Sequence, residues 1–529
     1  MTMFARGGVS NPERRDQQRT RLRHGDSMRS GSSRQHDGRR RVLLGALFVL
    51  AAAARIAAAR GDLWFDEIWS LSFARELDAP WEVLTRIHHD NNHPLNTLAL
   101  YLTVKAAGAH ARPIAYRLLS LLSGIAIIPC VCWLERRPAD RVSHARRWFA
   151  AIASGLSFLA LVYSSEARGY APVALCAVVA FTIVRRDDVP FTRNRRLAFA
   201  LACALGVLSH LTFAFVYAGL AAWTLVRARR ADSMAWRDWI AVQMLPAACL
   251  IGDYLVDVRK LNYGGGPPFR TGEVVARTLS LAVNGPAAGA LRNVAAGVTA
   301  ALVLVGIADL YARKDDEWVF FTTAVLLAPL SILLLYRARY LDPRYFFVLM
   351  PFFWMLAARS LARLWTRGTA GRVAAATFAG LYVAGGVAHA APFLRDQRGH
   401  YAAAVETVVQ LSALSPITIG SDHDVRNRMV LDYYGEVLPR SCQLTYVPAD
   451  AWDRRGPEWF VTHQFEDGGA ASSPPASIAV NAVEYRRTRS FPYGGISGWT
   501  WHLYHTTNPD VNRTASAGNV CRSEIHPGR

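Results

Sequence analysis

Two adjacent carboxylates, Asp66 and Glu67, follow directly after the first long apolar stretch of the sequence. They lie within an aromatic cluster of Trp64, Phe65 and Trp69, a composition typical of a membrane–water interface. Charged groups are costly in such a setting, so their presence favours a functional role over that of a solvated connector. A carboxylate held there is a candidate for a reacting group, and Asp66 is the first such candidate.

Several arginines stand at the ends of apolar stretches that are far apart in the chain. A single arginine of this kind commonly anchors a helix to lipid head groups. Several of them facing one acidic loop instead favour a site for an anionic lipid phosphate, because guanidinium groups bind phosphate through paired hydrogen bonds. The candidates for this role are Arg117, Arg337, Arg339 and Arg344.

The composition indicates what kind of protein must position these groups. Of 529 residues, 52% are hydrophobic and only 19% are charged, and the mean hydropathy is +0.12. The apolar residues come in long blocks, which indicates a polytopic membrane protein and excludes a secreted disulfide scaffold or a disordered chain. The net charge of +20 resides largely in arginine clusters between the blocks, where membrane topology explains it better than nucleic-acid binding.

The arginine clusters predict the orientation, because cytoplasmic loops are enriched in Lys and Arg. Residues 1–41 are expected to be a disordered cytoplasmic tail, and residues 42–390 a domain with about eleven transmembrane helices. Loop 61–112 then lies outside, with its apolar run 94–107 along the outer surface or re-entrant. The expected spans are 42–60, 113–134, 148–163, 171–184, 197–209, 211–226, 238–256, 290–311, 318–336, 345–362 and 372–390.

Residues 391–529 are polar and too long for a loop, so we expect a small extracytoplasmic α/β domain. Strands are predicted at 417–421, near 458–463 and at 499–504, with a helix near 425–434. Cys442 and Cys521 both fall in this domain, where a disulfide between them is compatible with an oxidising compartment. The fold class predicted is therefore an all-α polytopic membrane protein with a C-terminal α/β domain.

Five motifs, in order along residues 42–390, resemble the glycosyltransferase C superfamily in its protein-mannosyltransferase and aminoarabinose-transferase branch. One is the Asp66-Glu67 pair, and the next is the NHPL turn that contains His93. The others are the RLLS start of a span at Arg117, the YSSEARGY segment at 163–170, and Arg344-Tyr345 before a proline. The outer loop with surface helices is also a feature of that superfamily.

This resemblance implies the transfer of a sugar from a polyprenyl-phosphate carrier to an acceptor on the outer face of the bacterial cytoplasmic membrane. Asp66 would be the general base of an inverting transfer, with Glu67 orienting its neighbours or assisting. Arg344, with Arg339, Arg337 or Arg117, would bind the carrier phosphate. The residues expected to border the sugar or acceptor pocket are His93, Glu166, Arg168, Tyr170, His210 and Tyr345.

No cofactor is expected. A divalent cation on His88, His89, Asp90 and His93 is the less favoured reading, because their spacing is not that of a tight ligand set. The acceptor remains open among a glycan, a lipid and a protein hydroxyl. Two other functions stay as alternatives. A transporter or flippase for an anionic lipid-linked saccharide would place polar groups near the bilayer midplane, and a non-catalytic assembly partner would leave Asp66 without a role.

Overall fold

The computed structural model describes residues 38–136, 141–185, 192–229, 236–262, 270–336, 341–412, 416–439, 443–452, 455–465 and 473–507. The chain divides into two units, residues 1–50 and 51–529. In the first unit, residues 38–50 are helical and begin the helix Gly38–Ala58. Of the predicted disordered tail, residues 1–41, the first 37 lie outside the described residues, and residues 38–41 are helical.

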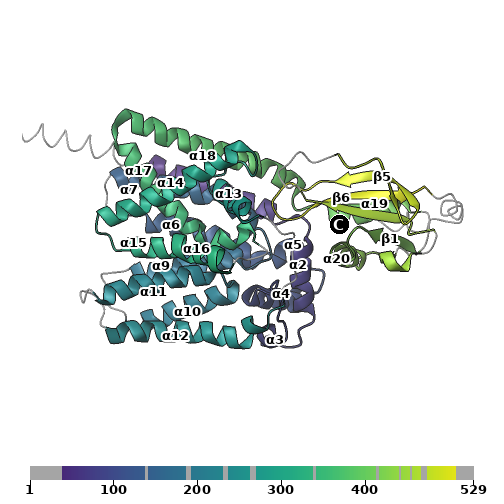
Figure 1. The fold of residues 1–529 in the computed structure, drawn as a ribbon, viewed down its shortest axis with the longest axis horizontal. Coiled ribbons are helices and arrows are strands. Elements are labelled where there is room, and N and C mark those ends of the chain that lie inside the picture. The colour runs from purple at the N-terminus through teal and green to yellow at the C-terminus, as the bar shows by residue number, and fades with distance from the viewer. Residues whose placement is uncertain are drawn as a thin grey trace, which may run out of the picture. The chain divides into compact units, whose positions relative to one another are not determined.

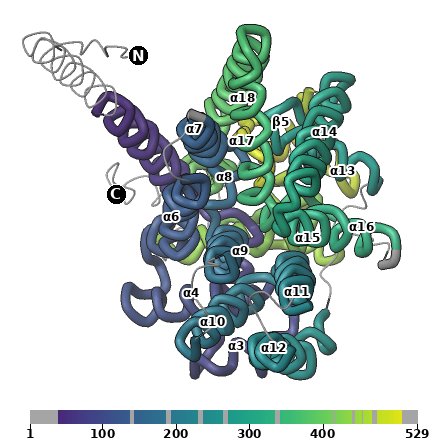
Figure 2. Tube along the Cα trace, turned by 90° about the vertical axis from the view of Figure 1, so that its left-hand side faces the viewer, coloured from purple at the N-terminus to yellow at the C-terminus, as the bar shows by residue number. Residues whose placement is uncertain are grey.

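Long helices make up most of the second unit and run side by side (Figures 1 and 2). Each of the predicted spans coincides with a helix or with a chain of helical segments. They include α6 (Leu118–Leu134), α7 (Arg141–Gly155), α8 (Phe158–Ser164), α9 (Tyr170–Arg185), α10 (Arg193–Ser209), α11 (Phe213–Arg229), α12 (Trp236–Val256), α14 (Ala290–Ala312), α17 (Met350–Thr366) and α18 (Gly368–Asp396). The span expected at 318–336 consists of α15 (Glu317–Phe321), η2 (Thr322–Leu327), α16 (Ala328–Ser331) and η3 (Ile332–Tyr336).

Six helices in the described part of the chain are long and apolar enough to cross a membrane, and the bent pair α7–α8 would be a seventh. Helices α6 and α9 are apolar but shorter. The chain is thus a multi-pass membrane protein, while the number of about eleven crossings and the orientation of the termini stay predictions. Helix α13 (Thr271–Ala282) was not expected from the sequence.

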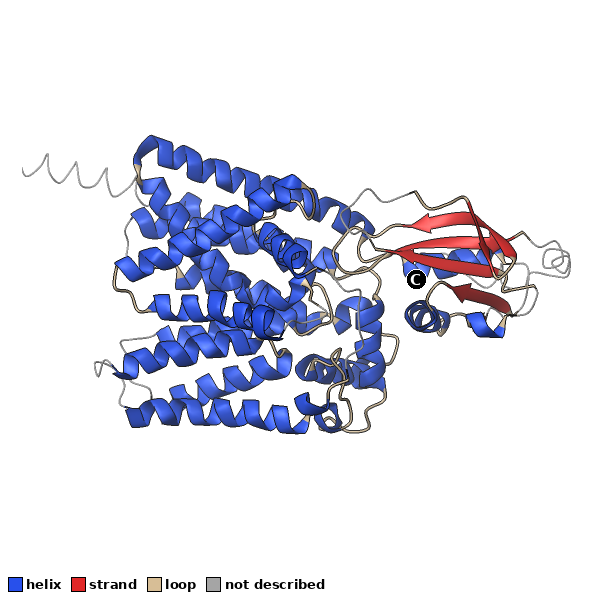
Figure 3. Ribbon diagram, viewed as in Figure 1, coloured by secondary structure: helices blue, strands red, loops and turns tan. Residues whose placement is uncertain are grey.

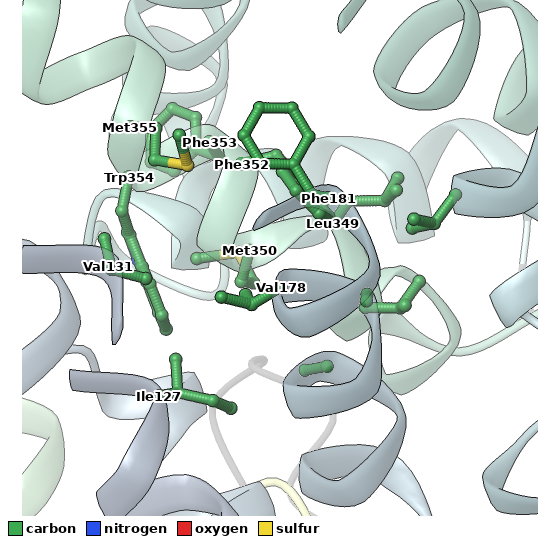
Figure 4. Close-up of a cluster of buried hydrophobic side chains, with 14 of the residues drawn as sticks. Ile127, Val131, Val178, Phe181, Leu349, Met350, Phe352, Phe353, Trp354 and Met355 are labelled. Carbon is green, nitrogen blue, oxygen red and sulfur yellow. The ribbon is translucent and has the colours of Figure 1, made fainter. Parts of the chain in front are cut away.

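Helix α17 forms the centre of the helical bundle. The long helical segment Pro343–Thr366 contains α17, and 83% of its most apolar 18 residues are buried inside the protein. The corresponding share is 17–33% in the other five long helical segments of the described chain. Figure 4 shows Trp354 of α17 with Ile127 and Val131 of α6, and Phe352 with Phe181 of α9. Residues 350–358 of α17 are all apolar and all buried, and a segment that is apolar on every side is stable when other elements surround it.

The outer loop contains four short helices, α2 (Phe65–Arg75), α3 (Glu82–Thr85), α4 (Pro94–Ala107) and α5 (Pro113–Tyr116). Helix α4 starts with proline in its first turn, where the missing N–H costs nothing. The apolar residues Trp69, Phe73 and Leu77 of this loop pack largely on protein. Leu77 is buried in a core, and the Trp69 ring lies 4.5 Å from that of His89.

The C-terminal region forms a mixed six-stranded sheet in the order β2-β1-β3-β6-β5-β4, the red arrows of Figure 3. Strand β1 pairs in parallel with both β2 and β3, and the remaining pairs are antiparallel. The predicted helix and strands are present as β1 (Ile417–Ser421), α20 (Asp424–Gly435), β3 (Trp459–Gln464) and β6 (Thr500–Thr506). The 3₁₀ helix η4 (Pro343–Leu349) leads into α17 and overlaps the start of the span expected at 345–362. Elements that were not predicted are α19 (Tyr401–Leu411), β2 (Leu444–Tyr446), β4 (Ser477–Val480), β5 (Val483–Phe491) and two short 3₁₀ turns, η1 (Val258–Lys260) and η6 (Ala449–Ala451).

The sheet region and the outer loop share one hydrophobic core. Phe65 of α2 lies 5.6 Å from Trp499 between ring centroids, and α20 packs against α2. The hydroxyl of Tyr434 donates to the Leu63 carbonyl at 2.9 Å. This shared core places the start of α2, and with it Asp66, between the bundle and the C-terminal sheet.

Candidate active site

Asp66 lies in the first turn of α2, where a carboxylate is stabilised by the positive end of the helix dipole. Its side chain is only partly exposed, and its Oδ2 is 2.6 Å from Nη1 of Arg344, a residue 278 positions later in the chain. A second guanidinium, that of Arg168, reaches within 3.9 Å of the same oxygen. The fold therefore brings together one carboxylate and two arginines from three separate parts of the sequence.

Arg344 is fixed by the start of η4. The Asp342 side chain accepts a hydrogen bond from the Arg344 backbone N–H at 3.0 Å and so caps this turn. The guanidinium lies over the ring of Tyr345, 5.6 Å from its centroid. Its buried Nε has no hydrogen-bond partner among the described residues, so part of the donor set is available to a ligand.

Arg168 lies in the turn between α8 and α9 and is nearly fully buried. Its Nη1 donates to the Ser70 hydroxyl at 3.3 Å and to the Asn91 side-chain oxygen, and the Asn91 amide donates to the Asp66 backbone carbonyl at 3.1 Å. Ser70 and Asn91 therefore tie Arg168 to the helix that carries Asp66. Neither residue was predicted from the sequence, where the only signal is the pair of asparagines just before His93.

Glu67 forms a buried ion pair with Arg117. Its two carboxylate oxygens accept from Arg117 at 2.7 and 2.6 Å, and Oε1 also accepts from the Ala167 backbone N–H at 2.7 Å. Burial alone would raise the pKa of Glu67, but the charge and hydrogen bonds of Arg117 outweigh it and hold that pKa below its usual value.

Arg117 was expected at the carrier phosphate, and the structure gives it other partners. Besides Glu67, its donors reach the backbone carbonyls of Ala59, Gly61 and Asp62 at 2.6–3.1 Å, and its side chain is fully buried. A guanidinium with its donors occupied in this way has nothing left for a phosphate. The geometry makes Arg117 a residue that positions the start of α2.

Glu166 was expected to border the sugar or acceptor pocket but is completely buried. Its oxygens accept from the indole N–H of Trp64 at 3.1 Å and from the Ser497 hydroxyl at 3.3 Å. Burial raises the pKa of Glu166, with Arg398 acting in the opposite direction. Glu166 thus connects the segment before Asp66 to the C-terminal region instead of lining an open pocket.

An aromatic cluster adjoins the two arginines. The His93 ring lies 4.7 Å from His210 and 5.3 Å from Tyr170, and His210 lies 6.0 Å from Tyr345, all between centroids. Arg168 lies over the Tyr170 ring at 5.7 Å. Four of the residues predicted to border the pocket therefore form one group beside Arg168 and Arg344.

Both histidines of this cluster are neutral at physiological pH. Burial lowers the pKa of His210 to about 3, and the positive charges of Arg168 and Arg344 act in the same direction. Burial also lowers the pKa of His93 well below its usual value. The Nδ1 of His93 lies 3.2 Å from the Ser209 carbonyl, and its buried Nε2 has no partner in the described structure, so this nitrogen is available to a substrate.

The other histidines of the outer loop go to separate places. His88 pairs with Asp257 at 2.7 Å, and the His89 ring lies against that of Trp69 in a tilted contact. Within the described ranges no group of three or more His, Cys, Asp or Glu side chains is arranged to hold a metal ion. Arg337, Arg339, Cys442 and Cys521 lie outside the described residues, so the proposed phosphate contacts of the first two and the disulfide stay predictions.

Comparisons with known proteins bear on the fold. No protein-family model and no curated protein matches this chain. Among solved structures, the crystal structure of ArnT from Cupriavidus metallidurans in the apo state matches with a TM-score of 0.52 and 14% sequence identity, over 88% of this chain and 98% of that one. The chain has the fold of ArnT.

The structure of ArnT bound to undecaprenyl phosphate also matches, with a TM-score of 0.45 and 16% identity over 89% of this chain and 98% of that one. ArnT is an aminoarabinose transferase of the glycosyltransferase C superfamily. At the level of the fold, the match to the apo structure confirms the resemblance that the sequence motifs indicated. It also confirms the fold class, a polytopic helical membrane protein with a small C-terminal sheet domain.

Proposed function

We propose that this protein is an integral-membrane glycosyltransferase that moves a sugar from a polyprenyl-phosphate carrier to an acceptor hydroxyl on the outer face of the bacterial cytoplasmic membrane. The observation that carries the proposal is the 2.6 Å contact of Asp66 with Arg344, with Arg168 at 3.9 Å from the same carboxylate. The motifs of the sequence and the ArnT fold support it. In this reading the N-terminus is cytoplasmic and the C-terminal sheet domain is extracytoplasmic.

The charge at the site suits an anionic phosphate. Two guanidinium groups, those of Arg168 and Arg344, face the Asp66 carboxylate, and the neighbouring histidines are uncharged, so the arginines are the groups here that can pair with an anion. Asp342 lies farther out, 3.8 Å from Nε of Arg344. Arginine stabilises a phosphate more strongly in such a low-dielectric position than in water, and most strongly when the phosphate gains charge as a leaving group.

Asp66 is the general base in this mechanism. It takes the proton of the acceptor hydroxyl as that oxygen attacks the anomeric carbon, and the bond from this carbon to the carrier phosphate breaks. The leaving polyprenyl phosphate is held by Arg344 and Arg168, and in-line displacement inverts the anomeric centre. A base placed in this way contributes about 10²–10⁴-fold to the rate.

The aromatic cluster is the place for the transferred sugar. His93, His210, Tyr170 and Tyr345 offer ring faces and hydroxyl or imidazole groups next to both arginines. The free Nε2 of His93 suits a hydrogen bond to a sugar hydroxyl. No step of this mechanism uses a cofactor, and the acceptor can be a glycan, a lipid or a protein.

The proposal is tested first in cells, where the sugar need not be known. The gene is deleted, the envelope glycans and glycolipids are compared by mass spectrometry, and the strain is complemented with wild type, D66N, R344A or D78N. Asp78 is the matched control, because it is an exposed carboxylate of the same outer loop. We expect one sugar to disappear on deletion and to return with wild type and D78N only.

The two site variants are then separated in purified protein by their binding of undecaprenyl phosphate. D66N should keep this binding and lose transfer, whereas R344A should weaken binding because it removes a charged phosphate partner. An unchanged glycan profile after deletion would refute the proposed function. Full complementation by D66N would refute the assignment of the base.

A further inference from the structure

A groove runs along α17 between α7 and α18, in a part of the bundle that the proposed mechanism does not use. Its floor is α17, where Phe353, Ala357 and Leu361 are nearly fully buried. Its rims are half-buried side chains, among them Ile152 of α7 and Ala379 of α18. The groove holds about 320 Å³ of unfilled space, counted to its open side. Helix α17 packs against both of the other helices, which lie next to it in Figure 2.

Small side chains at facing positions leave this space unfilled. They are Ala153 on α7, Ala357 and Ala358 on α17, and Ala379 on α18. The other lining groups are apolar except for the hydroxyl of Tyr382, and that hydroxyl already donates to the Ala153 carbonyl at 2.7 Å. Unfilled apolar space forfeits dispersion contacts in a structure that is otherwise densely packed. A groove of this composition in a membrane protein therefore suits a hydrocarbon chain.

One end of the groove carries a cluster of arginines. Arg363 stands two residues beyond Leu361 on α17, and Arg146 stands one turn before Phe149 on α7. The charges of Arg146 and Arg367 both act on Arg363, which places the three guanidinium groups near one another. The buried Nε of Arg363 has no hydrogen-bond partner among the described residues. This nitrogen is thus a donor that a ligand can satisfy.

A tight turn between α17 and α18 fixes the arginine cluster. Gly368 follows Arg367 directly and has φ +86°, in the left-handed region that glycine adopts without strain. A Cβ atom on Gly371 would lie 2.0 Å from the Leu364 carbonyl oxygen, so the two helices approach closely only because this residue is glycine. The turn therefore holds Arg367 at the mouth of the groove.

The charge at this end favours an anion. Asp309 of α14 pairs with Arg363 and also with Arg313 of its own helix, so one carboxylate serves two guanidinium groups. Arg146 and Arg367 add two further positive charges. This is the end of the bundle that the sequence predicts to be cytoplasmic, and basic pockets between helices on that side are typical binding sites for anionic lipid head groups.

The carboxylates one turn deeper do not cancel this charge, because they have arginine partners of their own. Arg359 lies 3.0 Å from Glu135 and 2.8 Å from Glu317, and Arg185 lies 2.7 Å from Glu317. These two carboxylates and two guanidinium groups balance one another. The arginine cluster at the mouth of the groove is thus a separate group.

We propose that this groove binds an anionic glycerophospholipid of the surrounding membrane, with an acyl chain along Ala357 and Ala379 and the phosphate at Arg146, Arg363 and Arg367. The chain fills the space between α7 and α18, and the phosphate accepts from the free Nε of Arg363. The lipid in this way joins three helices of the bundle at one end. The proposal does not rest on the transferase function.

The groove is remote from the candidate active site. Arg363 follows Arg344 by 19 residues along one helical segment, which corresponds to roughly 28 Å at the helical rise per residue. A lipid bound at Arg363 therefore does not reach Asp66 or Arg344. Binding of undecaprenyl phosphate at Arg344 and of the phospholipid at the groove should be independent of each other.

Binding is measured by native mass spectrometry on the purified, delipidated full chain in detergent. The probes are dioleoyl phosphatidylglycerol, dioleoyl phosphatidylethanolamine and sn-glycerol 3-phosphate. We expect phosphatidylglycerol to bind at least tenfold more tightly than the zwitterionic lipid, and the water-soluble phosphate to displace it poorly because it has no chain. Bound phosphatidylglycerol should also raise the unfolding temperature, since it binds the folded protein.

Variants locate the binding. R146Q/R367Q should weaken phosphatidylglycerol about tenfold or more, and its matched control is R229Q, an exposed arginine at the end of α11. A379L fills the groove and should weaken this lipid severalfold, and its matched control is A376L, one turn earlier on α18 and exposed. Both controls should bind as wild type does. Undecaprenyl phosphate should bind equally to all four variants.

Several results would overturn the proposal. Equal affinity for the two phospholipids would refute the role of charge, and displacement by sn-glycerol 3-phosphate at equal concentration would refute the acyl chain. Binding that R146Q/R367Q leaves unchanged, or that A376L weakens as much as A379L, would place the lipid elsewhere. Displacement by undecaprenyl phosphate at equal concentration would assign the groove to the carrier. A chain that binds no phospholipid but forms a dimer disrupted by A379L would assign it to a second copy.

Discussion

Replacing Arg117 tests whether this residue supports the active site or binds the carrier phosphate. Its side chain and that of Glu67 are both 0% exposed, and two charge-assisted hydrogen bonds of 2.6–2.7 Å join them. Removing one partner of such a pair leaves a buried charge without compensation, which costs about 3–5 kcal/mol. Three backbone carbonyls also lose their donor. We therefore expect R117A to destabilise the protein by at least about 3 kcal/mol.

Companion variants divide this loss into its parts. E67Q keeps the shape and one acceptor oxygen, so it should cost less than R117A. The double variant E67Q/R117M removes both charges, and its loss should be smaller than the sum of the two single losses by about 1–3 kcal/mol. R112A is the control, because Arg112 is exposed five positions earlier, and it should stay within about 0.5 kcal/mol of wild type.

The sign of the pH dependence follows from Glu67. Because its pKa is lower in the folded protein than in the unfolded chain, the unfolded chain binds more protons between the two values. The stability from this pair is therefore fully present above the unfolded pKa of about 4.3 and is lost as the pH falls through the folded value. E67Q should remove this part of the acid sensitivity.

The free energy of unfolding is measured by urea titration of the protein in detergent micelles, with tryptophan fluorescence as the probe. Undecaprenyl phosphate binding is measured on the same samples. R117A within about 1 kcal/mol of wild type would contradict the reasoning. A variant R117K that keeps wild-type stability but loses undecaprenyl phosphate binding would return Arg117 to the phosphate site.

Three further predictions concern positions around the site. A methyl group at Gly169 would come within 1.8 Å of a backbone carbonyl oxygen, so G169A should abolish transfer or unfold the protein. The control is G297A, because Gly297 lies in a helix with open space around it, and this variant should be neutral or slightly stabilising. The pKa of His210 is about 3 in the folded protein and near 6.5 in the unfolded chain. The neutral His210 side chain therefore contributes fully to stability above pH 6.5, and this contribution declines as the pH falls toward 3. H210N should reduce that decline in acid unfolding curves, and an unchanged curve would contradict a neutral His210. Y434F removes the hydrogen bond to the Leu63 carbonyl and should cost about 1 kcal/mol in the same titration, with a loss near zero showing that the apolar core alone fixes this contact.

The helices and the C-terminal strands were largely readable from the sequence. Long apolar blocks separated by arginine clusters predicted where the helices of the bundle lie, and period-two alternation predicted β6. The missed elements are those with weak local signals. Strand β2 has three residues, and strand β5 is largely exposed and polar, so neither shows a hydrophobic pattern. Helix α13 belongs to a segment read as a loop between two spans.

The candidate site was predictable only in part, because its geometry depends on contacts across the fold. Asp66 and Arg344 were paired by their common position at the outer ends of spans, and the structure brings them together. Arg117 and Glu166 also stand at the outer ends of spans, but Arg117 is bound to Glu67 and Glu166 to Trp64 inside the protein. No local sequence pattern indicates these two contacts. Sequence spacing gives the depth of a residue in the membrane but not the direction in which its side chain points.

The C-terminal domain is part of what places the proposed base, which explains why it shares a core with the outer loop. Glu166 accepts from Trp64 and from Ser497 of the C-terminal region. Arg398, completely buried after α18, donates to the Val162 carbonyl at 2.8 Å and to the Ser165 hydroxyl at 3.2 Å, and burial lowers its pKa to about 10. Its charge offsets part of the cost of burying the carboxylates of Glu166 and Glu67.

The start of α2 is therefore held from two sides. The bundle holds it through Arg117 and Ala167, and the C-terminal region holds it through Trp499 and the hydrogen bonds of Glu166. Displacing the sheet domain would remove Ser497, a partner of Glu166, and expose the apolar contact of Phe65 with Trp499. Phe65 directly precedes Asp66, and Glu166 holds Trp64, which lies two residues before Asp66. Docking of the C-terminal domain and correct placement of the Asp66 carboxylate are thus physically one event, so a chain without its sheet domain should lose the geometry of the base.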